Sequence, residues 1–132
     1  MTNKPGQLRD LSAPECWELL TTAPVGRIIW NTASGPEVVP VNFVADGSTI
    51  RIRTAAYSAL VQKVDAERVA FEADSIDETD HSGWSVVARG RAEVRYGADD
   101  GPTPEPWVGG TRHTIVAVVV DQITGRRLTT GS

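Results

Sequence analysis

Cysteine and histidine are scarce in this chain of 132 residues, which has one cysteine and two histidines. A lone cysteine, Cys16, excludes an intramolecular disulfide and fits a reducing compartment. His81 and His113 lie in different segments and lack metal-ligand spacing to Cys16, so we expect no metal centre. Because Cys16 falls on the apolar stripe of an expected helix, we interpret it as a buried small residue and not as a nucleophile.

Long apolar runs and an excess of positive charge are also missing. No apolar run approaches the roughly 20 residues that cross a bilayer, and the opening "MTNKPGQLRD" lacks the apolar core of a signal peptide. The formal net charge of -4 disfavours broad nucleic-acid binding, since basic residues must neutralise phosphates. We expect a cytoplasmic protein that binds neither membranes nor nucleic acid, with a flexible N-terminus over residues 1–10.

Motifs of known catalytic chemistry are absent as well. The sequence has no Walker loop, no glycine fingerprint at a strand-to-helix turn and no nucleophile elbow. The acidic segment "EADSIDETD" at residues 72–80 has no partner that the sequence identifies, and we interpret it as a solvated loop. The catalytic residues are therefore unknown from the sequence.

Period-two alternation and hairpin turns account for most of the chain. We expect six strands, near residues 25–31, 37–46, 49–54, 68–74, 84–96 and 113–123. Two short helices are expected, one near residues 12–23 with a capping box of Ser12 and Glu15, and one near residues 58–66. Hairpin connections favour an antiparallel sheet closed into a barrel, because closure protects strand edges. The fold class is mainly β, in a single domain over residues 1–132 with a long Pro/Gly loop at residues 98–110.

The stretch "IRIRTAAYSAL" at residues 50–60 is the best candidate for a binding site. If its isoleucines face the core, Arg51 and Arg53 share the opposite face of the strand. Arg53 then lies close to Thr54 and Ser58, just before a helix start that offers free backbone N–H groups. This combination suits a phosphate monoester. The alternative is a solvated sheet face followed by a serine cap, and the residues alone leave both open.

The order of motifs resembles the pyridoxamine 5'-phosphate oxidase-like proteins, the flavin-binding split barrels, in their small actinobacterial form. The resemblance covers most of the chain between residues 11 and 128. It is carried by "LSAPECWELL", "VGRIIW", "VVPVNFVADGSTIRIRT", "VAFEAD", "GWSVVARGRAEV", the Pro106–Trp107 pair and "TGRRL". It implies a six-stranded split barrel that forms a homodimer, with FMN in a groove where the two subunits meet.

The resemblance also implies a set of cofactor contacts. The flavin ring would rest against Pro40, Val41 and Asn42, and the phosphate would be held by Arg53 and Thr54 with Ser58 in the following turn. Trp84 and Ser85 would contribute from across the groove. Many members carry a lysine at the position of Ala59, and Lys63, one helical turn further on, would partly substitute for it.

The function implied by this resemblance is an FMN-dependent oxidoreductase that acts on an unidentified small molecule. In such a protein the flavin carries the electrons, which agrees with the absence of a prominent acid or base. The alternative is a non-catalytic module on the same scaffold that binds a flavin, a deazaflavin or another planar ligand. One fold hosts many functions, so the fold does not decide between them.

Overall fold

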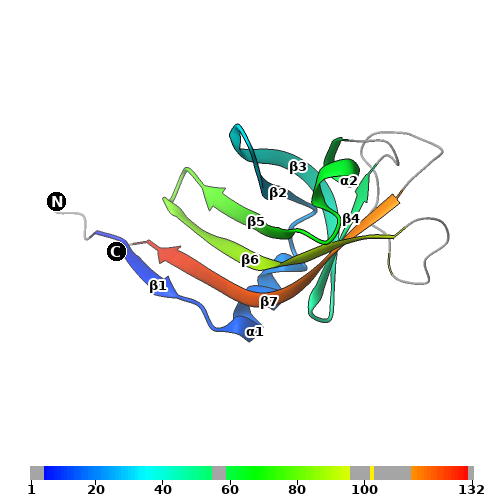
Figure 1. Ribbon diagram of the computed structural model, residues 1–132. Helices are drawn as coiled ribbons and strands as arrows, with labels where there is room; N and C mark the ends of the chain where they lie inside the picture. Colours follow the sequence, from blue (N-terminus) through cyan, green and yellow to red (C-terminus); the bar gives the residue numbers. More distant parts are fainter. Residues whose placement is uncertain (1–4, 55–58, 96–101, 103–113, 131–132) are drawn as a thin grey trace.

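The structure is a computed structural model that describes residues 5–54, 59–95, 102 and 114–130 (Figure 1). These residues form one antiparallel sheet and two short helices. In chain order the elements are β1 (Gln7–Asp10), α1 (Ala13–Leu20), β2 (Val25–Thr32), β3 (Gly35–Asp46), β4 (Thr49–Thr54), α2 (Ala59–Val64), β5 (Arg68–Asp77), β6 (Ser82–Arg95) and β7 (Thr114–Thr129).

The sheet closes into a barrel through its last strand. The strands are ordered β1-β7-β4-β3-β2-β5-β6, and a further pairing of β7 with β6 closes the ring. The first part of β7 lies between β4 and β6, so its residues 114–118 are buried on both faces. The prediction of a mainly β barrel is confirmed. The described residues contain seven strands, however, and the predicted number of six was wrong.

The additional strand is β1, within the segment predicted to be flexible. Its four residues pair with the end of β7, from Gln7 opposite Thr129 to Asp10 opposite Arg126. In Figure 1 this pairing lies at the end of the barrel where both chain ends are found. The sequence did not indicate this strand, because "QLRD" is polar and every one of its side chains is exposed. Backbone hydrogen bonds to β7 hold it in place.

The helices and remaining strands follow the sequence pattern with shifted ends. The α1 capping box is confirmed, since Ser12 Oγ accepts from the Glu15 N–H and the Glu15 carboxylate accepts from the Ser12 N–H. Strand β5 runs on to Asp77, so the first part of the predicted acidic loop is strand. Neither helix within the described residues is long and apolar enough to span a membrane.

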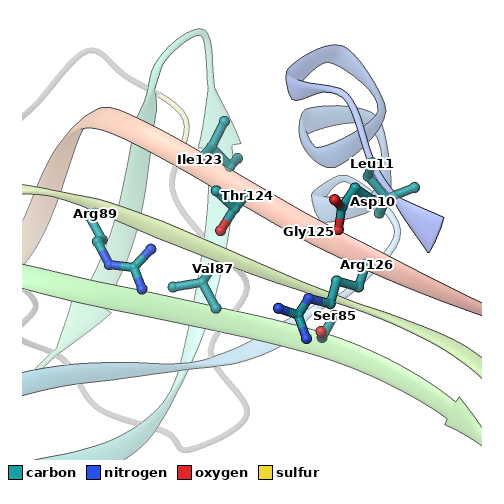
Figure 2. Close-up of a pocket in the computed structure, with 9 residues that line it drawn as sticks. All are labelled: Asp10, Leu11, Ser85, Val87, Arg89, Ile123, Thr124, Gly125 and Arg126. Atoms are coloured by element: carbon teal, nitrogen blue, oxygen red, sulfur yellow. The ribbon is translucent and has the colours of Figure 1, made fainter. Parts of the chain in front are cut away.

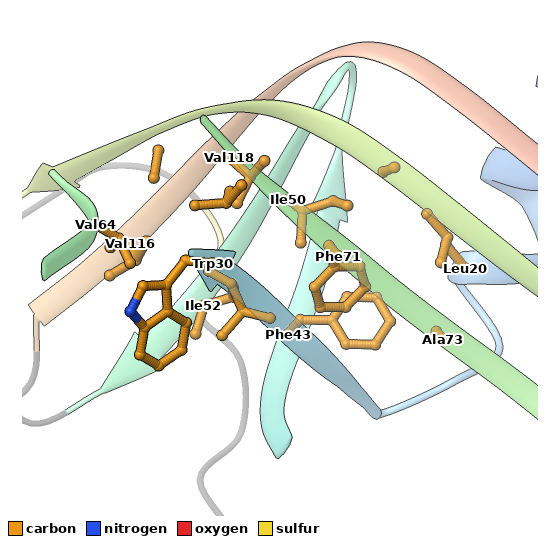
Figure 3. Close-up of a cluster of buried hydrophobic side chains, with 14 of the residues drawn as sticks. Leu20, Trp30, Phe43, Ile50, Ile52, Val64, Phe71, Ala73, Val116 and Val118 are labelled. Carbon is orange, nitrogen blue, oxygen red and sulfur yellow. The ribbon is translucent and has the colours of Figure 1, made fainter. Parts of the chain in front are cut away.

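The barrel interior is a continuous apolar core (Figure 3). Strand β6 shows the pattern clearly, because Val86, Ala88, Gly90 and Ala92 are buried whereas the residues that alternate with them, 87, 89 and 91, face outward. The Phe43 and Phe71 rings meet edge to face with centroids 4.7 Å apart. Helix α1 closes one part of the barrel by inserting Cys16 and Leu20 into this core.

Strands β6 and β7 carry a register shift between Arg89 and Gly90. A side chain at Gly90 would overlap the backbone carbonyl of Val119, so the two strands approach too closely there for any other residue. The irregularity bends β7 at mid-length and lets its second half continue along β6 toward β1.

Candidate functional site

The outer face of the barrel carries the polar residues that the core excludes. On β2, Gly26 and Ile28 are buried and face the core. Val25 and Arg27 alternate with them and therefore face outward. Asn42 faces outward on β3, next to the inward Phe43. Opposed residues in a sheet share a face, so the register of the strands identifies which outward side chains are neighbours.

The register brings predicted site residues from β3 and β6 into one line. Val25 pairs with Asn42, and Ser85 pairs with both Asp74 and Arg126. Arg27 pairs with Glu72, and continuing that register by two residues sets Val25 opposite Asp74. We call this line the outer row: Asn42, Val25, Asp74, Ser85 and Arg126. At about 4.8 Å per strand it spans roughly 19 Å along the barrel surface.

Arg53 lies at the Asn42 end of the outer row, and Thr54 follows it at the end of β4 on the opposite face of the strand. Phe43 pairs with Ile52, so the same register carried one residue further places Arg53 opposite Asn42. Both Arg53 and Thr54 are partly buried. Asn42 donates from its side-chain amide to the Pro24 carbonyl at 3.4 Å, which orients the amide at the end of the row.

Arg51 differs from Arg53 in its surroundings. The two arginines share the face opposite to Ile50 and Ile52, as predicted, but Arg51 is only 2% exposed. Its Nε donates to the Pro102 carbonyl at 2.6 Å, so part of the chain far away in sequence covers this part of the strand. The interpretation that both arginines lie on a solvated face was wrong for Arg51, which has a structural role.

The ring-contact candidates face in different directions. Pro40 is exposed on the outer face, where it pairs with Arg27. Val41 faces the core and is partly buried against it, so only its backbone is available to an outer ligand. Trp84 also faces inward and is 8% exposed, as part of the hydrophobic core. A contact between Trp84 and a flavin stays a prediction.

The remaining phosphate candidates lie around α2. Ser58 is outside the described residues, as is most of the predicted loop at residues 98–110. Lys63 is exposed in the last turn of α2, whose buried residues Leu60, Val61 and Val64 anchor the helix. A role for Lys63 in phosphate binding stays a prediction.

An ion-pair cluster lies between the two ends of the outer row. Arg27 Nη1 lies 2.6 Å from Glu72 Oε1 and 3.5 Å from Asp74 Oδ2, and all three side chains are partly buried. Burial, and then the hydrogen bond with the neighbouring Asp74 carboxyl, raise the pKa of Glu72 above its ordinary value of 4.5. Arg27 acts in the opposite direction and does not cancel this effect. The cluster is therefore a place on the outer face where a proton is held more tightly than usual.

A pocket opens at the Ser85 end of the outer row (Figure 2). It has a volume of about 630 Å³ and is lined by Asp10, Leu11, Ser85, Val87, Arg89, Ile123, Thr124, Gly125 and Arg126. In Figure 2 the guanidinium groups of Arg89 and Arg126 lie to either side of Val87, whereas Asp10 lies beside Gly125. Ser85 is thus a predicted site residue in a hydroxyl- and guanidinium-lined cavity.

Four residues of this face were missed at the level of the sequence: Arg27, Glu72, Asp74 and Arg126. The sequence identified no partner for Glu72 and Asp74, because Arg27 lies 45 and 47 residues away from them in the chain. The alternation of "RVAFEAD" does place both acids on one side of a strand and was the available signal. Among the described residues, no group of three or more histidine, cysteine, aspartate or glutamate side chains could hold a metal ion.

Comparison with known proteins places this fold in a family. The sequence pattern of the pyridoxamine 5'-phosphate oxidase family matches residues 12–127. The chain belongs to this family. An uncharacterized protein of Mycobacterium tuberculosis, Rv0080, is 33% identical over 132 residues, covering 93% of this chain and 87% of that protein.

Solved structures of similar proteins support the family assignment. A FAD binding protein from Mycobacterium smegmatis is 36% identical with a TM-score of 0.74, over 92% of this chain and 98% of that one. A candidate pyridoxamine 5'-phosphate oxidase from Corynebacterium glutamicum is 30% identical with a TM-score of 0.77, over the full length of both chains. The resemblance stated from the sequence motifs is confirmed.

Proposed function

We propose that the chain binds a flavin nucleotide on the outer face of the barrel and acts as a flavin-dependent oxidoreductase on a small molecule. The observation that carries this proposal is the outer row, because the sheet register aligns Asn42 and Ser85, which are about 40 residues apart, on one face. The similar Mycobacterium smegmatis protein binds FAD. We therefore take the ligand to be FMN or the FMN half of FAD.

The residues at the Asn42 end fit the parts of this ligand. Pro40 and Val25 provide an apolar outward surface on neighbouring strands, which suits a planar ring. The Asn42 amide, held by the Pro24 carbonyl, is a polar group that can orient the ring edge. Arg53, next to Asn42 in the extended register, supplies a cation for a phosphate, and Thr54 follows it at the end of β4 with a hydroxyl.

A bound flavin supplies the redox chemistry, since it takes up a hydride equivalent from a donor and passes two electrons to an acceptor. The protein contributes binding, orientation and exclusion of water. In the alternative function, a flavin, deazaflavin or other planar ligand is bound without turnover. The lysine that many members carry is replaced here by Ala59, which favours weaker phosphate binding and supports this second function.

One series of measurements distinguishes the two functions. Purified protein is mixed with excess FMN or FAD, freed of unbound flavin, and examined by absorbance. We expect a retained flavin spectrum that bleaches with NADH or NADPH and recovers with an added electron acceptor. A retained flavin that no donor bleaches would identify the binding module, and no retained flavin at high added FMN and FAD would refute flavin binding in both functions.

We also propose that the protein is a homodimer with the ligand between its subunits. The support is an outer face that continues the site with apolar residues. Val38 is 54% exposed and pairs with the partly buried Ile29, one outward position from Pro40 and Arg27. A second copy covering this face would exclude water from a ring that rests on Pro40.

A further inference from the structure

Arg27 on β2 has hydrogen-bond donors that its ion-pair cluster does not use. Its Nη1 atom donates to Glu72 Oε1 at 2.6 Å and to Asp74 Oδ2 at 3.5 Å. Within the described part of the chain, Nη2 and Nε of the same guanidinium make no hydrogen bond. The side chain is 43% exposed. The two carboxylates therefore fix the guanidinium through one nitrogen and leave its other N–H groups able to bind an acceptor.

The strand order places Arg27 beside the surface proposed for the flavin ring. Strand β2 lies between β3 and β5. Arg27 is opposite Pro40 on β3 and opposite Glu72 on β5. Because the carboxylates of the cluster start from β5, a ligand that rests on Pro40 meets the guanidinium from the other side, that of β3.

Arg27 and Asn42 lie at opposite corners of a block of four outward residues. Val25 pairs with Asn42, and two residues along the same strands Arg27 pairs with Pro40. The apolar pair of Val25 and Pro40 forms one diagonal of the block, about 4.8 Å wide and about 7 Å long. A ring on this diagonal has a polar side chain at each side. Asn42 is its neighbour toward Arg53 and the flavin phosphate, so Arg27 is its neighbour on the far side.

The chemistry of the flavin ring decides which of its ends suits Arg27. The pyrimidine end carries two carbonyl oxygens, whereas the dimethylbenzene end carries methyl groups and no acceptor. A guanidinium presents planar N–H donors that match such oxygens. Reduction by two electrons and one proton adds a negative charge at the pyrimidine end, which a nearby positive group favours. Arg27 therefore suits the pyrimidine end and stabilises the reduced ring.

The other charged groups of this face lie further from the proposed ring. Glu72 and Asp74 start from β5, one strand beyond Arg27 as seen from Pro40. Their charges oppose that of Arg27, but they act from a greater distance, and the interaction weakens with distance. The remaining charged side chains near the Ser85 end of the outer row start from β6 or from strands beyond it: Arg89, Arg126 and Asp10. The ring thus meets the positive side of the ion-pair cluster first.

We propose that Arg27 donates hydrogen bonds to the pyrimidine carbonyls of the bound flavin and so sets the orientation and the reduction potential of the ring. Glu72 and Asp74 are positioning residues in this assignment, because they hold Nη1 and leave the other nitrogens to the ring. The inference rests on the proposed function, since it names a further contact of the same flavin site.

The midpoint potential of the bound flavin tests this role. The full chain loaded with FMN is reduced slowly by xanthine and xanthine oxidase beside a reference dye, and both absorbances are followed. Arg27→Gln should lower the potential by about 30 mV, which is a tenfold weaker preference for the two-electron reduced flavin. Asp74→Asn should raise the potential, because it removes a negative charge beside Arg27. If both variants shift the potential in the same direction, the role assigned to the charge of Arg27 is wrong.

Arg68→Gln is the matched control for this measurement. Arg68 is an outward arginine of β5 that pairs with Asp121, and it lies four residues, or roughly 13 Å, from Glu72 along the strand. The same loss of charge there should leave the potential within experimental error, and a shift as large as that of Arg27→Gln would overturn the inference. Arg27→Lys keeps the charge and should recover most of the wild-type potential. Circular dichroism shows whether each variant is folded.

Riboflavin affinity tests the hydrogen bonds of Arg27 separately from the flavin phosphate. In a fluorescence titration, Arg27→Gln should bind riboflavin about tenfold more weakly than the wild type, since charge-assisted hydrogen bonds are lost. Arg53→Ala should leave riboflavin affinity unchanged. If Arg27→Gln keeps both the wild-type affinity and the wild-type potential, the inference is overturned and the flavin site stands. If the wild type takes up no flavin, the proposed function is refuted together with the role of Arg27.

Discussion

Glu72 is a residue of the outer face whose pKa the fold raises. Burial and the adjacent Asp74 raise its pKa above the ordinary 4.5, so the folded protein binds this proton more tightly than the unfolded chain does. The protonated Glu72 therefore stabilises the fold at pH values below the pKa of Glu72 in the unfolded chain. This contribution to the free energy of unfolding is lost as the pH rises through the pKa of Glu72 in the folded protein. Glu72 therefore contributes a fall in the free energy of unfolding above about pH 4.5.

Replacing Glu72 by Gln should remove this contribution. In urea unfolding between pH 4 and pH 8, we expect the variant to lose less stability with rising pH than the wild type does. Glu78→Gln, in the exposed turn after β5, is the control and should follow the wild-type curve. If the free energy of unfolding changes with pH equally in the wild type and in Glu72→Gln, the role assigned to Glu72 is contradicted.

The arginine side chains show which features of single residues could be predicted from the sequence and which could not. Alternation correctly placed Arg51 and Arg53 on one face of β4, because the period of a strand is two. It could not predict that Arg51 is buried, since its cover includes Pro102, 51 residues away. The ion-pair cluster of Arg27 could not be predicted either. Its partners lie on another strand, and the register between strands cannot be read from the sequence.

The β6–β7 ladder is the element on which the pocket depends. It holds the register shift at Gly90, and a methyl group there would overlap the Val119 carbonyl. Gly90→Ala should therefore destabilise the fold by roughly 1–3 kcal/mol, as overpacking of a rigid site typically does. Chemical denaturation measures this change, with Arg91→Ala as a neighbouring substitution that should have little effect. A Gly90→Ala protein as stable as the wild type would show that the strands can separate at this point.

Element ends were predicted less well than element types. The apolar strands and both helices were identified from periodicity and capping residues. Strand β1 was missed, and β7 was predicted to end near residue 123 whereas it continues to Thr129, because these sequences are polar and irregular. They are strands because they complete the hydrogen bonding of their neighbours, which is a property of the assembled sheet. The same tertiary pairing extends β5 through Ser75 and Asp77.

At the scale of the whole molecule, the proposed homodimer predicts a specific hydrodynamic size. Size-exclusion chromatography with light scattering should give twice the chain mass of 14.2 kDa. Val38→Asp should shift the protein toward the monomer, because it places a charge on the apolar outer face beside Pro40. Glu37→Asp at the neighbouring exposed position should leave the dimer unchanged. A wild-type monomer at micromolar concentration would contradict the proposed assembly.

The family and the barrel were predictable because many short motifs occur in one order along most of the chain. The site was predictable in part, since Arg53, Asn42 and Ser85 lie on the outer face whereas Val41 and Trp84 point inward. The outer row that joins these residues became visible only with the register of five strands. The pocket between Arg89 and Arg126 likewise depends on the pairing of β6 with β7.

The measurement that tests the central claim most directly compares FMN with riboflavin, which lacks the phosphate, by fluorescence titration of wild type and Arg53→Ala. The account predicts that the wild type binds FMN more tightly than riboflavin, by roughly tenfold or more. It predicts that Arg53→Ala abolishes this difference while leaving riboflavin affinity unchanged. If wild type and Arg53→Ala bind FMN equally well, or if neither flavin binds, the assignment of the flavin phosphate to Arg53 is wrong.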